Sequence, residues 1–209
     1  MKEYFTVKGK SRESIEIKHS KFIASCCHIE SREEASEFLA KICKEFSDAT
    51  HNCYAYISDK NGMEIKFSDN GEPSGTAGQP ILDAIQKSGL KEIIIVVTRY
   101  FGGIKLGASG LVGAYSSSAA AVLKSIQWVK MRPSVVLELT IPYSFGKKCD
   151  ALPKNYDGII LNKEYTDIIK LTLSLPQEKV DDLKNAFLDL TKGQGIVNEI
   201  GEEYRELLL

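Results

Sequence analysis

The segment from Asp69 to Tyr115 restricts the fold of this chain most, because nine of the 16 glycines lie within it. Glycine loses more backbone entropy on folding than any other residue, so this concentration predicts left-handed turns, close backbone approach or tight helix packing. The segment holds two glycine-rich loops, Asp69–Gly78 and Thr98–Gly107, and each leads into a sequence with helical periodicity. A helix N-terminus presents unpaired N–H groups and a partial positive charge, so each loop is a candidate anion site.

The bulk composition is that of an ordinary globular protein. Hydrophobic residues make up 43% and charged residues 26% of the 209 residues, a length that suits one large domain or two small ones. The net charge of -1 gives no global signal for nucleic acid, so RNA or phosphate binding would require a local patch. The N-terminus lacks the apolar segment of a signal peptide, and the longest apolar run, Ile93–Val97, is too short to span a membrane. We therefore expect a cytoplasmic protein with no membrane partner.

The five cysteines predict free thiols rather than disulfides or a metal site. Their number is odd and no C-x-x-C pair is present, so the spacing fits neither a zinc site nor a disulfide framework. Reduced thiols are the simple interpretation for a cytosolic protein, and we expect neither a metal nor a cofactor. The cysteines are Cys26, Cys27, Cys43, Cys53 and Cys149.

The first part of the chain mixes strand and helix patterns. Ser31 is a candidate N-cap, with Glu34 at the spacing of a capping box. Asn61-Gly62 is a strong hairpin signal, and Ile93–Val97 is an apolar run typical of a strand buried on both faces. These patterns predict strands at residues 4–10, 14–18, 22–29, 53–58, 64–67 and 93–97, and helices at 31–44, 80–90 and 108–126.

The helix expected at 108–126 has an unusual face of small residues. Ser109, Gly110, Gly113, Ala114, Ser117, Ser118 and Ala121 fall at spacings of three and four. Such a face allows very close approach to a sheet, so packing explains these residues as well as a ligand does.

The remainder of the chain predicts a second domain. After a connector at 128–133, the patterns indicate strand 135–141, helix 143–152, strands 158–162 and 167–175, helix 178–190 and strand 196–204. The βαββαβ order is the ferredoxin-like arrangement. We therefore expect an α/β protein of the α+β type, with domains at 1–130 and 134–209.

The second loop has the glycine spacing of a P-loop, Gly102-x-x-x-x-Gly107, but not its chemistry. Ala108-Ser109 stands where a P-loop has Lys-Ser/Thr, which excludes an ordinary P-loop NTPase. Lys105 and Arg99 are placed to neutralise a phosphate over the helix start. The alternative is that both are solvated loop cations.

The first loop brings two carboxylates, Asp69 and Glu72. A carboxylate pair can act as general acid and base. The alternative is turn chemistry, because Asp at the start of a turn accepts backbone N–H groups and Glu72 precedes the turn-forming Pro73. We favour the turn role for Asp69. His51 and Cys53 share a strand face and could form a nucleophile pair, but a small buried thiol is the commoner case.

Taken together, these motifs resemble those of the YigZ/IMPACT family. The resemblance covers nearly all of residues 1–128, and residues 135–209 look like the C-terminal domain of its bacterial branch. The matching segments are Ser20-Lys21-Phe22-Ile23, His51-Asn52-Cys53-Tyr54-Ala55-Tyr56, Asp69-x-Gly71-Glu72-Pro73-x-Gly75-Thr76-Ala77-Gly78-x-Pro80-Ile81, Val97-Thr98-Arg99-Tyr100-Phe101-Gly102-Gly103-x-Lys105-Leu106-Gly107 and Gly110-Leu111-x-x-Ala114-Tyr115.

The resemblance implies a fold and a function. The family's N-terminal fold is similar to the second domain of the small-subunit ribosomal protein S-five type, and its C-terminal domain is similar to elongation factor G domain V. Its eukaryotic member is a translation regulator. We therefore expect a translation-associated binding protein that contacts RNA, the ribosome or a ribosome-associated partner, rather than an enzyme. The alternative is an enzyme that acts on a phosphorylated or nucleotide-like small molecule.

The expected site follows from the residues of the two loops, and the resemblance adds two departures. Catalysis, if there is any, would fall to Glu72 or Asp69. Two positions depart from the family, because Ser109 stands where Gly is usual and Gly113 where Arg is usual, which removes one cation. The expected anion- or RNA-binding residues are Arg99, Lys105, Gly102, Gly103, Gly107, Ser109 and Lys21, and the first-loop signature is Asp69, Gly71, Glu72, Pro73, Gly75, Thr76 and Gly78.

Overall fold

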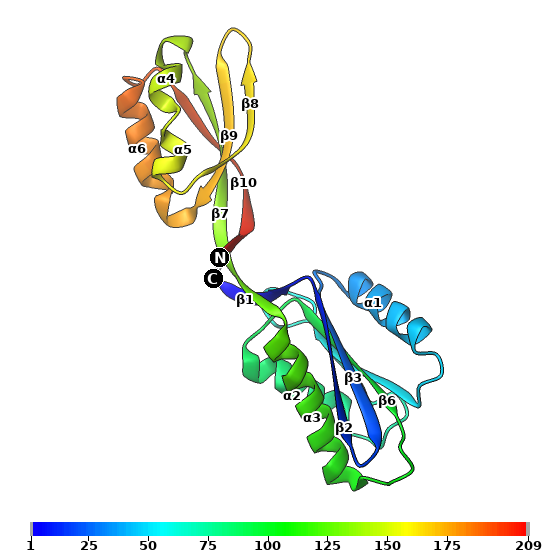
Figure 1. Cartoon of the computed structure of the whole chain (residues 1–209). Coiled ribbons are helices and arrows are strands. Elements are labelled where there is room, and N and C mark those ends of the chain that lie inside the picture. The colour runs from blue at the N-terminus through cyan, green and yellow to red at the C-terminus, as the bar shows by residue number, and fades with distance from the viewer. Residues whose placement is uncertain (1, 208–209) are drawn as a thin grey trace. The chain divides into compact units, whose positions relative to one another are not determined.

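The structure is a computed structural model that describes residues 2–207. The described chain divides into two compact units, one spanning Tyr4–Lys130 and the other Met131–Leu207 together with residues 2–3. Each unit contributes its own helices, and most of the elements are labelled in Figure 1. No helix among the described residues is long and apolar enough to cross a lipid bilayer.

The N-terminal unit is built on an antiparallel sheet in the order β2-β3-β6-β4-β5. β6 is central because its apolar run can be buried on both sides, as the sequence predicts. Ile93, Ile95 and Val97 join one core cluster, and Ile94 and Val96 join another on the opposite face. The strands are β2 (Lys10–Ile17), β3 (Ser20–His28), β4 (His51–Ile57), β5 (Ile65–Ser68) and β6 (Ile93–Tyr100), and β1 (Tyr4–Lys8) pairs instead with β7 (Gln127–Ile141).

Helices cover both faces of this sheet (Figure 1). α1 (Arg32–Glu45) packs Phe38 and Ile42 against one face. α2 (Gly78–Ser88) and α3 (Gly107–Ser125) cover the other. β6 is therefore buried on both faces within an antiparallel sheet, although continuous apolar runs like Ile93–Val97 are more typical of strands in parallel sheets.

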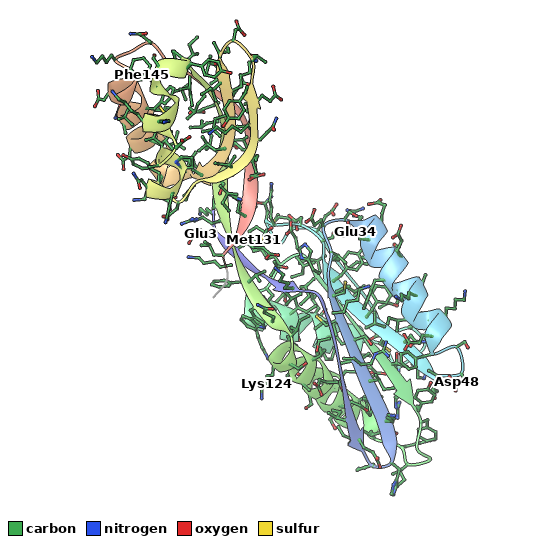
Figure 2. The ribbon with its side chains drawn as sticks, turned by 45° about the horizontal axis from the view of Figure 1, so that its top comes forward. Glu3, Glu34, Asp48, Lys124, Met131 and Phe145 are labelled. Carbon is green, nitrogen blue, oxygen red and sulfur yellow. The ribbon has the colours of Figure 1, made fainter. Side chains whose placement is uncertain are left out.

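Local signals in the sequence are confirmed with two differences. The Ser31 side chain accepts the Glu34 N–H at 3.2 Å, so it caps α1, whose ends lie near Glu34 and Asp48 in Figure 2. The Glu34 carboxylate, however, accepts from the Glu30 N–H rather than from that of Ser31. The β4–β5 turn is longer than Asn61-Gly62 alone, because the Asp59 carboxylate gathers three backbone N–H groups within the loop.

The small-residue face of α3 does not serve sheet packing as a whole. Ala114 and Ser118 are buried, but Ser109, Gly113 and Ser117 are exposed. A Cβ added to Gly113 would meet nothing within 4 Å. Close packing therefore explains only part of the pattern.

Gly102 is the glycine that the fold cannot replace. An added Cβ would lie 2.0 Å from the carbonyl carbon of His19, in the turn between β2 and β3. Gly78 is similar, since its Cβ would lie 2.7 Å from the Ser68 backbone. Both glycines serve close approach within the protein, so glycine content alone is not evidence for a ligand.

The C-terminal unit has the ferredoxin-like topology expected from the sequence. Its sheet has the order β10-β7-β9-β8, and α4, α5 and α6 lie on one side of it (Figure 1). The core is formed by alternate residues such as Leu137 and Leu139 against Leu183 and Phe187. The elements are η1 (Tyr143–Phe145), α4 (Gly146–Cys149), α5 (Leu152–Asn155), β8 (Ile159–Tyr165), β9 (Ile169–Pro176), η2 (Gln177–Lys179), α6 (Val180–Leu190) and β10 (Ile196–Leu207).

Two sequence interpretations of this region are wrong. The connector expected at 128–133 lies inside β7. Pro133 is compatible with an extended backbone, and the strand loses only the one hydrogen bond that a proline cannot donate. The helix expected at 143–152 is instead a 3₁₀ turn followed by two short helices. The domain limits of 1–130 and 134–209 stay a prediction.

The contrast between Gly102 and Gly113 gives a matched test of stability. Gly102→Ala should lower the free energy of unfolding by about 1–3 kcal/mol, because the backbone of the β2–β3 turn must shift. Gly113→Ala should raise it by up to about 1 kcal/mol, since alanine is the better residue in an exposed helix. Urea unfolding followed by the fluorescence of Trp128, the only tryptophan, reports on the N-terminal unit. Equal midpoints for the two variants would contradict the packing at Gly102.

Candidate functional site

A cleft of about 320 Å³ opens in the N-terminal unit where β6 runs into α3. Both glycine-rich loops and the start of β4 contribute to it. Its lining is Thr50, His51, Glu72, Pro73, Arg99, Phe101, Lys105, Leu106, Gly107, Ala108 and Leu111.

A buried ion pair forms one wall of the cleft. Arg99 Nη1 donates to Glu72 Oε1 at 2.6 Å, and the Tyr115 hydroxyl donates to the same oxygen at 2.7 Å. The side chains of Arg99 and Glu72 are only 7% and 3% exposed. Charges so buried persist only when paired. The pair therefore joins the first loop, β6 and α3 through one carboxylate oxygen.

The second Glu72 oxygen faces a histidine. His51 Nε2 lies 3.9 Å from Glu72 Oε2. The other ring nitrogen, Nδ1, lies 3.0 Å from the Asn70 carbonyl oxygen. A carbonyl can only accept, so Nδ1 carries a proton and the ring is held in a fixed orientation.

The groups behind this wall are unreactive at neutral pH. Burial raises the pKa of Cys53 to about 12, and its thiol donates to the Asp69 carbonyl oxygen at 2.9 Å. Burial, with Cys53 and Glu72 nearby, also raises the pKa of Tyr115. Because only the thiolate is nucleophilic, Cys53 is a packed core residue, the role favoured from sequence.

Asp69 organises the first loop. Its carboxylate accepts the N–H groups of Gly75, Ala77 and Gly78 at 2.8 to 2.9 Å. Burial acts to raise the pKa of Asp69, but these three donors outweigh it and the pKa is lowered. The carboxylate thus stabilises the start of α2, which is the chemistry of a turn-forming Asp.

The rim of the cleft is cationic and partly apolar. Lys105 is exposed and makes no ion pair with any residue in the described part of the chain. α3 begins beside it without a side-chain cap and without an acidic residue in its first turn. Phe101 is 47% exposed, and the Arg99 guanidinium carbon lies 5.5 Å from its ring centroid. Because Arg99 offsets Glu72, the lining charges sum to one positive charge, that of Lys105.

The structure brings together only some of the residues expected from sequence. Arg99, Lys105, Gly107, Glu72 and Pro73 line the cleft. The others do not: Gly102 and Gly103 shape the second loop, Ser109 is exposed on α3, Lys21 lies on β3, and Asp69, Gly71, Gly75, Thr76 and Gly78 build the first loop.

Sequence reasoning missed several members of the site. Phe101 and Tyr115 stand in the matched motifs, but nothing in their spacing singles them out. Leu106 and Leu111 stand in the matched motifs too, without a signal for a role in a site, and Thr50 lies outside those motifs. His51 stands in a matched motif, but its position in the sequence indicates a pairing with Cys53 alone, because the distance to Glu72 depends on how the first loop folds back on β4.

Comparison with known proteins defines the class of this protein first. Residues 18–123 match the Impact N-terminal domain, and residues 139–194 match a domain of unknown function, DUF1949. A crystal structure described only as that of a hypothetical protein superposes with a TM-score of 0.66 at 32% identity, covering 96% of this chain and 98% of that one.

Two bacterial relatives narrow this class to one family. IMPACT family member YvyE of Bacillus subtilis is 35% identical over 196 residues, which cover 94% of this chain and 90% of YvyE. IMPACT family member YigZ of Escherichia coli is 36% identical over 180 residues, covering 85% and 88%. The chain belongs to the IMPACT family, which confirms the resemblance seen in its motifs. Protein IMPACT homolog of Dictyostelium discoideum matches over 99 residues, 46% of this chain and 28% of that protein.

The buried pair predicts a specific pattern of stability. Glu72→Gln should lower the free energy of unfolding by about 3–5 kcal/mol, because it leaves the Arg99 charge buried without a counter-charge. Adding Arg99→Met should restore much of this loss by removing that charge. Urea unfolding followed by Trp128 fluorescence measures both effects. A double variant less stable than the single one would show that Arg99 is stabilised by other groups.

Proposed function

We propose that this protein is a translation-associated binding protein whose N-terminal cleft takes a segment of single-stranded RNA. Family membership supports the translation setting, which the resemblance to the eukaryotic regulator implies. The observation that carries the RNA assignment is the rim of the cleft. The rim combines the uncapped start of α3, the unpaired Lys105 and the half-exposed Phe101. The neighbouring charges of Glu72 and Arg99 offset each other.

The chemistry of the rim matches a nucleotide unit. The free N–H groups at the start of α3 and the Lys105 ammonium suit a phosphate oxygen. The exposed face of Phe101 suits a base, since stacking of a base on an aromatic ring does not depend on its sequence. Because stacking on Phe101 and contact with a phosphate are both independent of base identity, we expect weak sequence preference.

Binding of single-stranded RNA tests this proposal. Lys105→Ala should weaken binding of a short oligouridylate several-fold. It should also reduce the slope of log K against log salt concentration by the contribution of about one phosphate contact, because one counterion fewer is released. Phe101→Ala should weaken binding by about 1–3 kcal/mol with the salt dependence unchanged. Fluorescence anisotropy at several salt concentrations measures both.

Lys87→Ala is the matched control, because Lys87 is an exposed lysine of the same unit at the end of α2, away from the cleft. If Lys105→Ala and Lys87→Ala change the affinity equally, the cleft is not the binding surface. The same variants tested for co-sedimentation with ribosomes show whether the cleft also carries ribosome association.

The wall of the cleft favours a second candidate, an enzyme acting on a phosphorylated or nucleotide-like small molecule. Glu72 and His51 both line the cleft, and Glu72 Oε2 lies 3.9 Å from His51 Nε2, while Arg99 and Tyr115 donate to the other carboxylate oxygen. A carboxylate beside an oriented imidazole is a common acid–base arrangement.

A turnover screen separates the enzyme from the binder. The wild type should leave nucleotides and phosphorylated metabolites unchanged if binding is the function. An enzyme should turn over one of them, with a loss of about 10²–10⁴-fold in His51→Gln. His51→Gln is preferred to Glu72→Gln here because it leaves the buried pair intact. Turnover that His51→Gln abolishes, with unfolding and RNA binding unaltered, would replace the binding proposal.

A further inference from the structure

A second cleft lies in the C-terminal unit, where β7 and β10 meet α5 and the turn that follows it. Arg132 and Ser134 alternate along β7 with the core residue Val135, so they lie on the same face of that strand. Together with β10 and the turn before β8 they enclose a volume of about 500 Å³. This volume is larger than that of the N-terminal cleft.

Cations from three elements converge on this cleft. Arg132 comes from β7, Arg205 from β10 and Lys154 from α5. The two arginine side chains are only 21% and 19% exposed. Guanidinium groups withdrawn from water to this extent require partners to offset the loss of hydration.

The partners within the protein satisfy these arginines incompletely. Arg132 Nε is buried and has no hydrogen-bond partner among residues 2–207, and its Nη1 reaches Glu178 Oε1 only at 3.5 Å. Arg205 Nη1 donates to the Ser174 carbonyl oxygen at 3.1 Å, a neutral acceptor, and its Nε lies 3.4 Å from Glu203 Oε1. Both guanidinium groups therefore lack a short hydrogen bond to a carboxylate within the described residues.

The acidic groups of the cleft do not cancel this charge. Asp157 and Glu206 also line it, and both are exposed. Three cations and two acids leave one positive charge, and the cations include the two partly buried ones. Lys154 is exposed and makes no ion pair within the described residues, so it can move toward a ligand.

We infer that this cleft is a second binding site for a phosphate group. Arg132 and Arg205 donate to its oxygens from the sheet, and Lys154 closes over it from α5. Arginine suits this role because its planar fork matches the oxygens of phosphate. The phosphate can belong to a small phosphate ester or to a nucleic acid strand, since both present the same oxygens. The inference does not depend on the N-terminal cleft.

Amide chemical shifts of the full chain test this site directly. Sodium phosphate should shift the amides of Ser134 and Gly158, which line the cleft, more than sodium chloride does at equal ionic strength. Arg132→Gln should raise the apparent dissociation constant by about tenfold or more, since it removes hydrogen bonds to a charged group. Lys154→Ala should raise it several-fold without affecting the fold, because Lys154 is exposed.

Two controls separate the site from general charge effects. Lys147→Ala removes an exposed lysine of α4 that does not line the cleft, and Lys105→Ala removes the cation of the N-terminal cleft. Both should leave the phosphate shifts of Gly158 unchanged. The inference is overturned if phosphate shifts these amides no more than chloride, or if Lys154→Ala and Lys147→Ala behave alike.

Comparison of two further ligands identifies the source of the phosphate. If uridine monophosphate binds as tightly as a uridine hexanucleotide, the site takes small phosphate esters. If the hexanucleotide binds at least tenfold more tightly, it takes a nucleic acid strand. Either result supports a phosphate site. If neither ligand shifts the amides more than sodium chloride does, the site is refuted.

Discussion

The arrangement of the N-terminal cleft depends on the buried contact between Glu72 and Arg99. A single carboxylate oxygen receives Arg99 from the end of β6 and Tyr115 from α3, while its own residue lies in the first glycine-rich loop. Three segments that are distant in sequence are thereby held at one point. Because each partner is buried, separating them exposes a charge to an apolar interior, and the arrangement is kept as a unit.

This contact is also what makes the proposed binding of a phosphate at the cleft compatible with a carboxylate in its wall. An unpaired carboxylate in its wall would repel phosphate, whereas the Arg99 guanidinium offsets Glu72 before any ligand enters. The field at the rim is then set by the start of α3 and by Lys105. The glycines contribute indirectly, since Gly102 allows the second loop to lie on the β2–β3 turn and so fixes the direction of Phe101 and its neighbours.

Local signals in the sequence predicted most of the fold, and pairwise contacts account for what they missed. The apolar run of β6, the cap at Ser31 and the βαββαβ order are properties of short segments, so they could be recognised directly. The continuation of β7 through Pro133 could not be recognised from the sequence. A proline indicates the end of a strand unless its neighbours show that no backbone N–H is needed at that position. In the site, Arg99 and Glu72 were both singled out, but as a phosphate ligand and a proton-transfer group. Their mutual pairing depends on how the first loop folds back, which spacing does not reveal.

The unequal burial of the cysteines makes the thiols natural reporters of local opening. Cys26 and Cys53 are fully buried in the sheet, whereas Cys27 and Cys43 are partly accessible. Alkylating reagents attack the thiolate, so the accessible pair should react first, and Cys53, whose pKa is raised to about 12, should react only when β4 parts from α3. The modification rate of that single thiol thus measures how often the wall behind the cleft comes apart, and a ligand that holds the wall together should slow it.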